Sequence, residues 1–266
     1  MNNVNRTLYI PLYGRAMVSR QGILLHDPKA EEIWQKEGVC LKGKAASKWL
    51  AYNMAMRAKV FDQWTERMLQ MSPESKLLHI GCGLDSRCLR VSAGAGMWYD
   101  IDFPEVILER QKYYDETENY RMVAADVRKE SWKREIPSGG RAIVVMEGVS
   151  MYLRREELVQ LATVLREWFS EVHLLMDCYS VFAAWASRYK NPVNEMGVTT
   201  LYGLDDPQEL AKETGFAFLS AHDLTPETMI RQLTKAEQRI FHLLYAGKTA
   251  KSLYRLYEFE AKNEPA

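Results

Sequence analysis

Short apolar runs alternate with stretches of helical periodicity along most of the chain, and this alternation predicts an α/β fold. The apolar runs indicate strands at residues 76–80, 97–102, 120–127, 141–148, 171–177 and 216–221. Helical stretches separate them, at residues 86–93, from residue 104, at 154–169 and from residue 207. Because strands joined by helices lie parallel in one sheet, we predict a doubly wound, mostly parallel sheet, which residues 253–260 complete as a seventh, antiparallel strand.

The first 70 residues carry apolar positions at helical spacing and no strand pattern. We therefore expect a helical N-terminal lid over residues 1–70, with a long helix at about 44–69. Residues 71–178 are the predicted cofactor-binding core. Residues 179–266 are expected to supply a substrate-facing insertion, a helix at 225–245 and the strands that close the sheet. A length of 266 residues and 47% hydrophobic content suit a single domain with a sizeable core.

The first predicted strand ends in a Gly81-x-Gly83 turn, which is the first candidate for a ligand site. A glycine has no Cβ, so the backbone can turn sharply and a ligand can lie against it, while Asp85 can cap the next helix. An ordinary strand-to-helix turn would look the same. However, Asp102 follows about 20 residues later, where nucleotide-binding folds use a carboxylate to hold ribose hydroxyls. Together these residues predict a nucleotide-like ligand.

Two further carboxylates lie at the ends of predicted strands. Asp126 follows an apolar run, and Glu147 lies within the run 144–149. Ligands on open parallel sheets bind beyond the carboxyl ends of the strands, where both side chains are expected. Asp126 could instead cap the following helix. Glu147 is the sharper signal, because a charge in an apolar run is costly to bury without a partner such as a ligand.

Arg57 lies on the long helix that leads into the first predicted strand, among apolar and aromatic residues. One interpretation is a solvated side chain, since most helix arginines are exposed. The alternative is a clamp for the carboxylate of a cofactor. Arginine suits that role because its planar fork forms two parallel hydrogen bonds with a carboxylate.

The charge and cysteine content narrow the class of protein. Thirty-five basic and 35 acidic residues give zero net charge, and no Lys/Arg block favours nucleic acid or an anionic membrane, so a small or neutral partner is expected.

The four cysteines lack the spacing of a disulfide framework or a zinc site, so we expect no metal site and a location in the reducing cytoplasm. No signal pattern or membrane-length apolar run is evident. The oligomeric state is not predicted.

Four motifs together resemble a known family. They are Gly81-x-Gly83-x-Asp85-Ser86-Arg87, Tyr99-x-Ile101-Asp102-Phe103-Pro104, Ala125-Asp126-Val127-Arg128 and Glu147-Gly148-x-x-Met151-Tyr152-Leu153. Their order and spacing are similar to class I S-adenosylmethionine-dependent methyltransferases, closest to the leucine carboxyl methyltransferase family with its tetracenomycin-type polyketide O-methyltransferases. Segments 8–16 and 57–62 resemble the same family, and the similarity extends from residue 7 to about residue 225. The C-terminal third departs most from the family pattern.

This resemblance implies roles for residues around the methionyl half of S-adenosylmethionine. Arg57 would hold the methionine carboxylate. Gly81 and Gly83 would approach the methionyl portion, and Glu147 would lie near its amino group and the substrate mouth.

It also implies roles around the adenosine half. Asp102 would take the ribose hydroxyls, and Phe103, directly after it, is grouped with the cofactor-binding residues. Asp126 and Val127 would face the adenine.

Two other functions stay open on the sequence. A nicotinamide-dependent oxidoreductase is disfavoured because Ser86 occupies the third glycine position of the dinucleotide fingerprint. A catalytically silent S-adenosylmethionine-binding protein would keep the same cofactor residues and need no acceptor pocket.

The expected acceptor is an oxygen nucleophile on a small metabolite such as a polyketide, with a carboxylate favoured over a phenol. The sulfonium methyl group is already activated, so the enzyme mainly aligns the nucleophile and excludes water. A carboxylate is ionised at neutral pH, whereas a phenol with a pKa of about 10 gains from a general base. No base is evident, since His79 and His173 lie in predicted strands and are expected to be structural. A protein C-terminus remains an alternative acceptor, because the family methylates one.

Four tyrosines are candidates for the acceptor site, which the N-terminal segment and residues 179–203 are expected to enclose. Tyr152 could orient an acceptor oxygen, or be an aromatic residue of the core. Tyr9, Tyr13 and Tyr179 could line the acceptor pocket under the lid, or pack within the lid itself.

Overall fold

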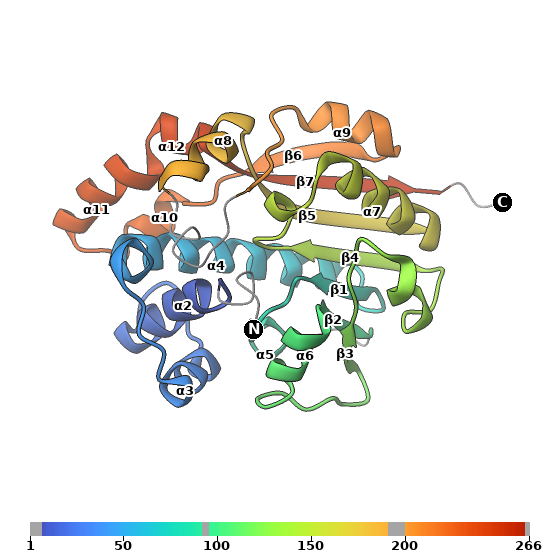
Figure 1. Cartoon of the computed structure of the whole chain (residues 1–266), viewed down its shortest axis with the longest axis horizontal. Coiled ribbons are helices and arrows are strands. Elements are labelled where there is room, and N and C mark those ends of the chain that lie inside the picture. Colours follow the sequence, from blue (N-terminus) through green and yellow to red (C-terminus); the bar gives the residue numbers. More distant parts are fainter. Residues whose placement is uncertain (1–6, 92–95, 191–199, 264–266) are drawn as a thin grey trace.

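The computed structural model describes residues 7–91, 96–190 and 200–263, which contain one seven-stranded sheet (Figure 1). Its order is β3-β2-β1-β4-β5-β7-β6. The strands are β1 (Lys76–Ile80), β2 (Trp98–Asp102), β3 (Tyr120–Ala124), β4 (Arg141–Met146), β5 (Glu171–Tyr179), β6 (Ala217–His222) and β7 (Tyr254–Lys262). Strands β1 to β5 pair in parallel, whereas β7 is antiparallel to both β5 and β6. The predicted seven-stranded, doubly wound sheet is confirmed, and its winding direction switches between β1 and β4.

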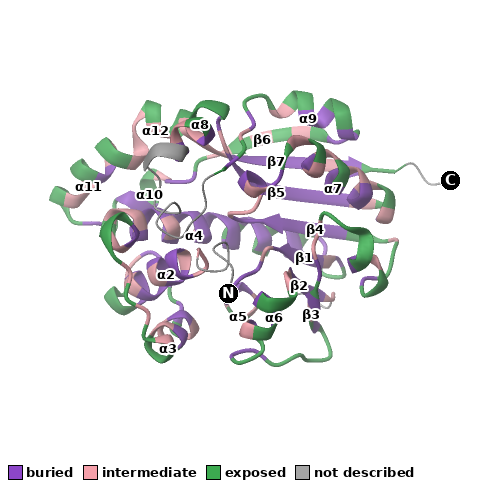
Figure 2. Ribbon diagram, in the orientation of Figure 1, coloured by how far each residue is buried: buried purple, intermediate pink, exposed green. Residues whose placement is uncertain are grey.

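Helices cover both faces of the sheet. They are α2 (Tyr9–Gln21), α3 (Pro28–Glu37), α4 (Lys48–Met71), α5 (Arg87–Arg90), α6 (Pro104–Arg110), α7 (Arg155–Trp168), α8 (Val181–Lys190), α9 (Pro207–Thr214), α10 (Glu227–Ile230), α11 (Lys235–Phe241) and α12 (Lys248–Leu253). Successive strand residues point to opposite faces, so Leu77 packs with the core of α2 and α4 while Leu78 packs with that of α7 and α9. Figure 2 shows the central strands buried along most of their length. The sheet is therefore packed between two hydrophobic cores, one on each face.

The N-terminal helices form a layer on α4. Gly14 on α2 lies close to α4, because a Cβ there would be 3.0 Å from the carbonyl oxygen of Ala51. The long helix begins at Lys48 rather than at residue 44, since a short 3-10 turn, Gly43–Ala46, precedes it. As the periodicity indicated, the described part of the first 70 residues contains no strand.

Two predicted helices differ from the observed ones. The helix expected at 86–93 ends at Arg90, where Val91 turns to an extended conformation. The helix expected at 225–245 is divided, because Thr234 starts a new helix through reciprocal hydrogen bonds with Glu237. This capping box is a sequence signal for a helix start that the periodicity alone missed. No described helix has the length and apolar character to cross a membrane.

Candidate active site

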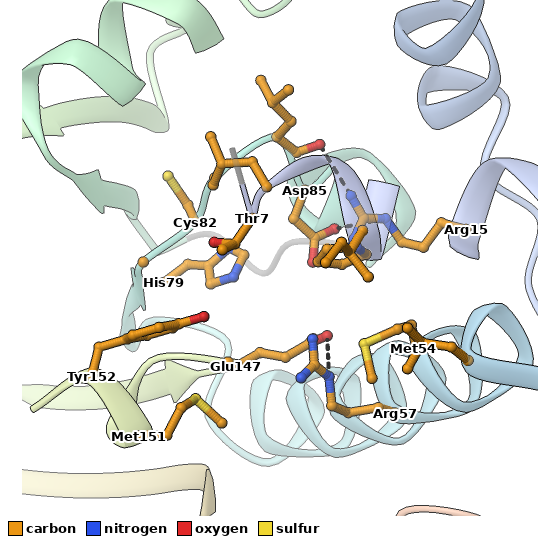
Figure 3. A pocket seen from close by; sticks show the side chains of 18 of the residues that line it. Thr7, Arg15, Met54, Arg57, His79, Cys82, Asp85, Glu147, Met151 and Tyr152 are labelled. Atoms are coloured by element: carbon orange, nitrogen blue, oxygen red, sulfur yellow. Dashed lines mark hydrogen bonds and ion pairs between the residues drawn. The ribbon is translucent and has the colours of Figure 1, made fainter. Parts of the chain in front are cut away.

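Three adjoining cavities lie at the carboxyl edge of the sheet. The central cavity has a volume of about 160 Å³ and lies between the ends of β1 and β4, under α2 and α4 (Figure 3). The β2-side cavity, about 500 Å³, extends over the ends of β2 and β3, and the β7-side cavity, about 780 Å³, extends over the ends of β5 and β6. The central cavity thus sits at the topological switch point, where ligands bind in open α/β sheets.

The glycine turn forms one wall of the central cavity. Gly81 and Gly83 have φ angles of +69° and +51°, which L side chains rarely adopt. A Cβ on Gly81 would overlap the side chain of Val149, and one on Gly83 would lie 2.9 Å from Leu8 Cδ2. Backbone conformation and space therefore both require glycine at these two positions, and the turn they make lines the central cavity.

Asp102 is held in place by the glycine turn. Its Oδ2 accepts a hydrogen bond of 2.8 Å from the Gly83 N–H, and its Oδ1 accepts one of 2.8 Å from the Phe103 N–H. Each oxygen keeps a lone pair free, because a carboxylate accepts about four bonds. Burial raises the pKa of Asp102 to about 6. The carboxylate lines the β2-side cavity and can accept two hydroxyl donors there.

Phe103, Asp126 and Val127 line the same β2-side cavity. Asp126 is tied to Arg128, whose Nε and Nη2 each donate a hydrogen bond of 2.8 Å to it. These hydrogen bonds lower the pKa of Asp126. The structure therefore brings together all four residues assigned to the adenosine half, around one partly apolar cavity.

Arg57 is buried, with only 5% of its surface exposed, so the solvated interpretation is wrong. Its Nε donates to Glu147 Oε1 at 2.9 Å, and its Nη1 donates to Asp177 Oδ2 at 3.0 Å and to the Tyr254 hydroxyl at 2.6 Å. The guanidinium lines the central cavity beside Gly148 (Figure 3). It is a buried cation next to the glycine turn.

Glu147 receives a second arginine that the sequence did not indicate. Arg87, fully buried, donates to Glu147 through Nη2 and to Asp62 through Nε at 2.7 Å. The carboxylate of Glu147 thus bridges Arg57 and Arg87, which compensates the cost of burying it. Asp177 was visible as a charge at the end of an apolar strand, but its partner, 120 residues away on α4, was not.

The tyrosine candidates separate into two groups. Tyr152 lines the central and β2-side cavities, and Tyr179 lines the central and β7-side cavities. Tyr9 instead donates to Glu37 at 2.8 Å, and Tyr13 packs on Trp34 with ring centroids 5.1 Å apart. Neither Tyr9 nor Tyr13 is among the residues that line the three cavities, so lid packing is the interpretation that the structure favours for both.

His79 and Tyr152 could act as bases in the central cavity. The histidine, however, is paired with Arg87, and the tyrosine hydroxyl is protonated. His79 lines the central cavity, but its Nε2 is paired with Arg87 Nη1 at 3.2 Å, and its Nδ1 is enclosed by protein, 3.2 Å from Asp100 Oδ1 and without a hydrogen bond. Burial raises the pKa of Tyr152 to about 12, so its hydroxyl stays protonated at neutral pH. Tyr152 is thus equipped to donate a hydrogen bond to an acceptor oxygen rather than to remove a proton.

Comparisons with known proteins identify the class of this fold and site. Residues 6–165 match the leucine carboxyl methyltransferase family. The tetracenomycin polyketide synthesis O-methyltransferase TcmP of Streptomyces glaucescens is 30% identical over 213 residues, covering 79% of this chain and 78% of that protein. The S-adenosyl-L-methionine-dependent methyltransferase dpfgK of Gibberella zeae is 30% identical over 172 residues, or 59% of this chain and 58% of that protein. Magnesium protoporphyrin IX methyltransferase (ChlM) of Synechocystis PCC 6803 shares the fold, with a TM-score of 0.51, 10% identity and coverage of 87% and 93% of the two chains.

The fold, the glycine turn and these matches define an S-adenosylmethionine-dependent O-methyltransferase. The chain belongs to the leucine carboxyl methyltransferase family. Its residues fit the cofactor, since the glycine turn and Arg57 line the central cavity, and the adjoining cavity is lined by Asp102, a carboxylate with free lone pairs. The nicotinamide-dependent alternative is thereby set aside.

Proposed function

We propose that this enzyme methylates a carboxylate oxygen of a small molecule. The observation that carries the proposal is the state of the central cavity's candidate bases: His79 faces Arg87 and Asp100 through both ring nitrogens, and Tyr152 remains protonated. An acceptor that is already ionised at neutral pH needs no base. The family of the chain is named for carboxyl methylation, which supports the same acceptor.

The cofactor is proposed to span the central and β2-side cavities, which share Thr7, Leu8, Gly81, Gly148 and Tyr152. Asp102 would accept the ribose hydroxyls, and Phe103, Asp126 and Val127 would surround the adenine. At the other end, Arg57 would hold the methionine carboxylate.

Glu147 would complete this arrangement by facing the methionyl amino group. It lies between Arg57 and Arg87, so its negative charge is oriented as well as compensated. Gly81 and Gly83 would let the methionyl chain pass against the backbone.

Methyl transfer requires the protein to align the methyl donor with the acceptor oxygen and to exclude water. S-adenosylmethionine, when bound, supplies a methyl carbon whose bond to sulfur breaks as a bond to oxygen forms, the electron pair passing to sulfur. Tyr152, at the junction of two cavities, would orient the acceptor oxygen by donating a hydrogen bond. No proton changes place when the acceptor is a carboxylate.

We expect Asp102→Ala to weaken S-adenosylhomocysteine binding by about 1–3 kcal/mol, the cost when hydroxyls lose a charged acceptor. In the wild type the affinity should also fall as the pH drops below about 6, since the carboxylate then takes up a proton. Titration calorimetry between about pH 5 and pH 8 measures both effects. Asp102→Asn, which does not titrate, is the control and should lack this pH dependence. A flat wild-type profile would contradict the role of Asp102.

The acceptor class is testable from the product. Incubation with methyl-labelled S-adenosylmethionine and a metabolite extract should yield a small labelled compound whose label is released by mild alkali, because esters hydrolyse. An alkali-stable label would indicate a phenol ether, and label in the protein fraction would indicate a protein C-terminus. Cofactor binding without any labelled product would favour a catalytically silent binding protein.

A further inference from the structure

The wall of the β7-side cavity includes an amide that has no hydrogen-bond partner within the described protein. Asn53 on α4 is only 6% exposed and lines this cavity. Within the described residues, its side chain makes no hydrogen bond. Its amide atoms are not among the enclosed polar atoms that lack a partner, so they are reachable from the cavity, where an amide can both donate and accept a hydrogen bond with a ligand.

The face of α4 that carries Asn53 joins this cavity to the cofactor site. Asn53 and Met54 follow Leu50 by three and four residues and precede Arg57 by four and three, so the four residues share one side of the helix. Leu50 and Met54 line both the central and the β7-side cavity, as does Tyr179. Asn53 lies one turn, about 6 Å, before Arg57.

Part of the cavity wall is apolar and exposed, beside the polar Thr249 and Lys251. It comes from a π-helical turn, His242–Ala246, and from α12, and neither element contains a buried residue. Leu243 and Leu244 line the cavity with 83% and 47% of their surfaces exposed, and Tyr245 and Tyr254 add aromatic surface. π-helical turns are frequent at functional sites, and exposed apolar surface beside a cavity suits an apolar ligand.

We propose that the β7-side cavity is the acceptor site and that Asn53 recognises a polar oxygen of the acceptor remote from the methylated carboxylate. This inference rests on the proposed carboxylate methylation. The apolar wall would hold an aromatic ring system, and Asn53 would bond a hydroxyl or carbonyl oxygen on it. The acceptor class is therefore an aromatic carboxylic acid with a second, distal oxygen substituent.

The test measures binding rather than turnover, on the full-length enzyme saturated with S-adenosylhomocysteine. The probes are 6-hydroxy-2-naphthoic acid and 2-naphthoic acid, which differ only in the distal hydroxyl. We expect the wild type to prefer the hydroxylated acid by about three- to tenfold, the contribution of one hydrogen bond. Asn53→Leu should abolish this preference without changing the S-adenosylhomocysteine affinity or the melting temperature, since Asn53 makes no bond within the described protein.

Two further variants define the controls. Gln63→Leu makes the same amide-to-leucine change at an exposed position of α4 outside this cavity and should keep the preference. Leu243→Ser should weaken both probes alike while keeping their ratio. A preference that survives in Asn53→Leu, or no saturable binding of either probe to the loaded enzyme, overturns the acceptor site. Failure to bind S-adenosylhomocysteine at all would instead refute the proposed function.

Discussion

Replacing Arg87 by methionine will lower the free energy of unfolding by about 3–5 kcal/mol, the loss typical when one partner of a buried ion pair is removed. Arg87 is fully buried and lies 2.7 Å from Asp62 and 3.5 Å from Asp85, and it also bonds Glu147. Methionine fills much of the same space but leaves these carboxylates with less positive charge around them. Denaturant titration followed by circular dichroism measures the change.

Arg128→Met is the matched control for this prediction. Arg128 also pairs with a carboxylate, Asp126, at 2.8 Å, but 42% of its side chain is exposed. Water therefore screens the pair, and its removal should cost less than about 1 kcal/mol. Equal losses for the two variants would show that burial does not set the strength of these ion pairs.

The second large effect is expected from Arg57→Lys, which should weaken S-adenosylhomocysteine binding by roughly 10- to 100-fold although the charge is kept. In the wild type, separate nitrogens of the guanidinium reach Glu147 and Asp177 while the group stays beside Gly148 in the central cavity. A single ammonium cannot reproduce this fork and also clamp a carboxylate of the cofactor.

A truncated ligand makes this test specific. 5′-Methylthioadenosine contains the adenosine half of the cofactor and no amino-acid group, so Arg57→Lys should leave its affinity unchanged. Calorimetry with both ligands distinguishes a lost clamp from general damage to the site. Equal weakening of the two ligands, or no change with S-adenosylhomocysteine, would contradict the assignment of Arg57.

Local sequence patterns correctly predicted those structural features that depend only on residues close together in the chain. Short apolar runs predicted the seven strands, because a strand that is buried on both faces of the sheet reads as a continuous apolar segment. The Gly81-x-Gly83 turn and Asp102 were also found, since a positive φ and a strand-end carboxylate have local signatures. The helix break at Thr234 had such a signature too, in its capping box with Glu237.

Only the tertiary structure decided which charged residues pair in the interior. It also decided which aromatic side chains line a cavity. Arg57 meets Asp177 and Glu147 across 120 and 90 residues, and no local pattern encodes such a distance. Tyr9 and Tyr179 were equivalent candidates in the sequence, yet one bonds Glu37 inside the lid and the other lines two cavities. The position of Asn53 in a cavity wall could not be seen before folding, because only the packing of α4 decides which of its polar side chains face protein and which face a cavity.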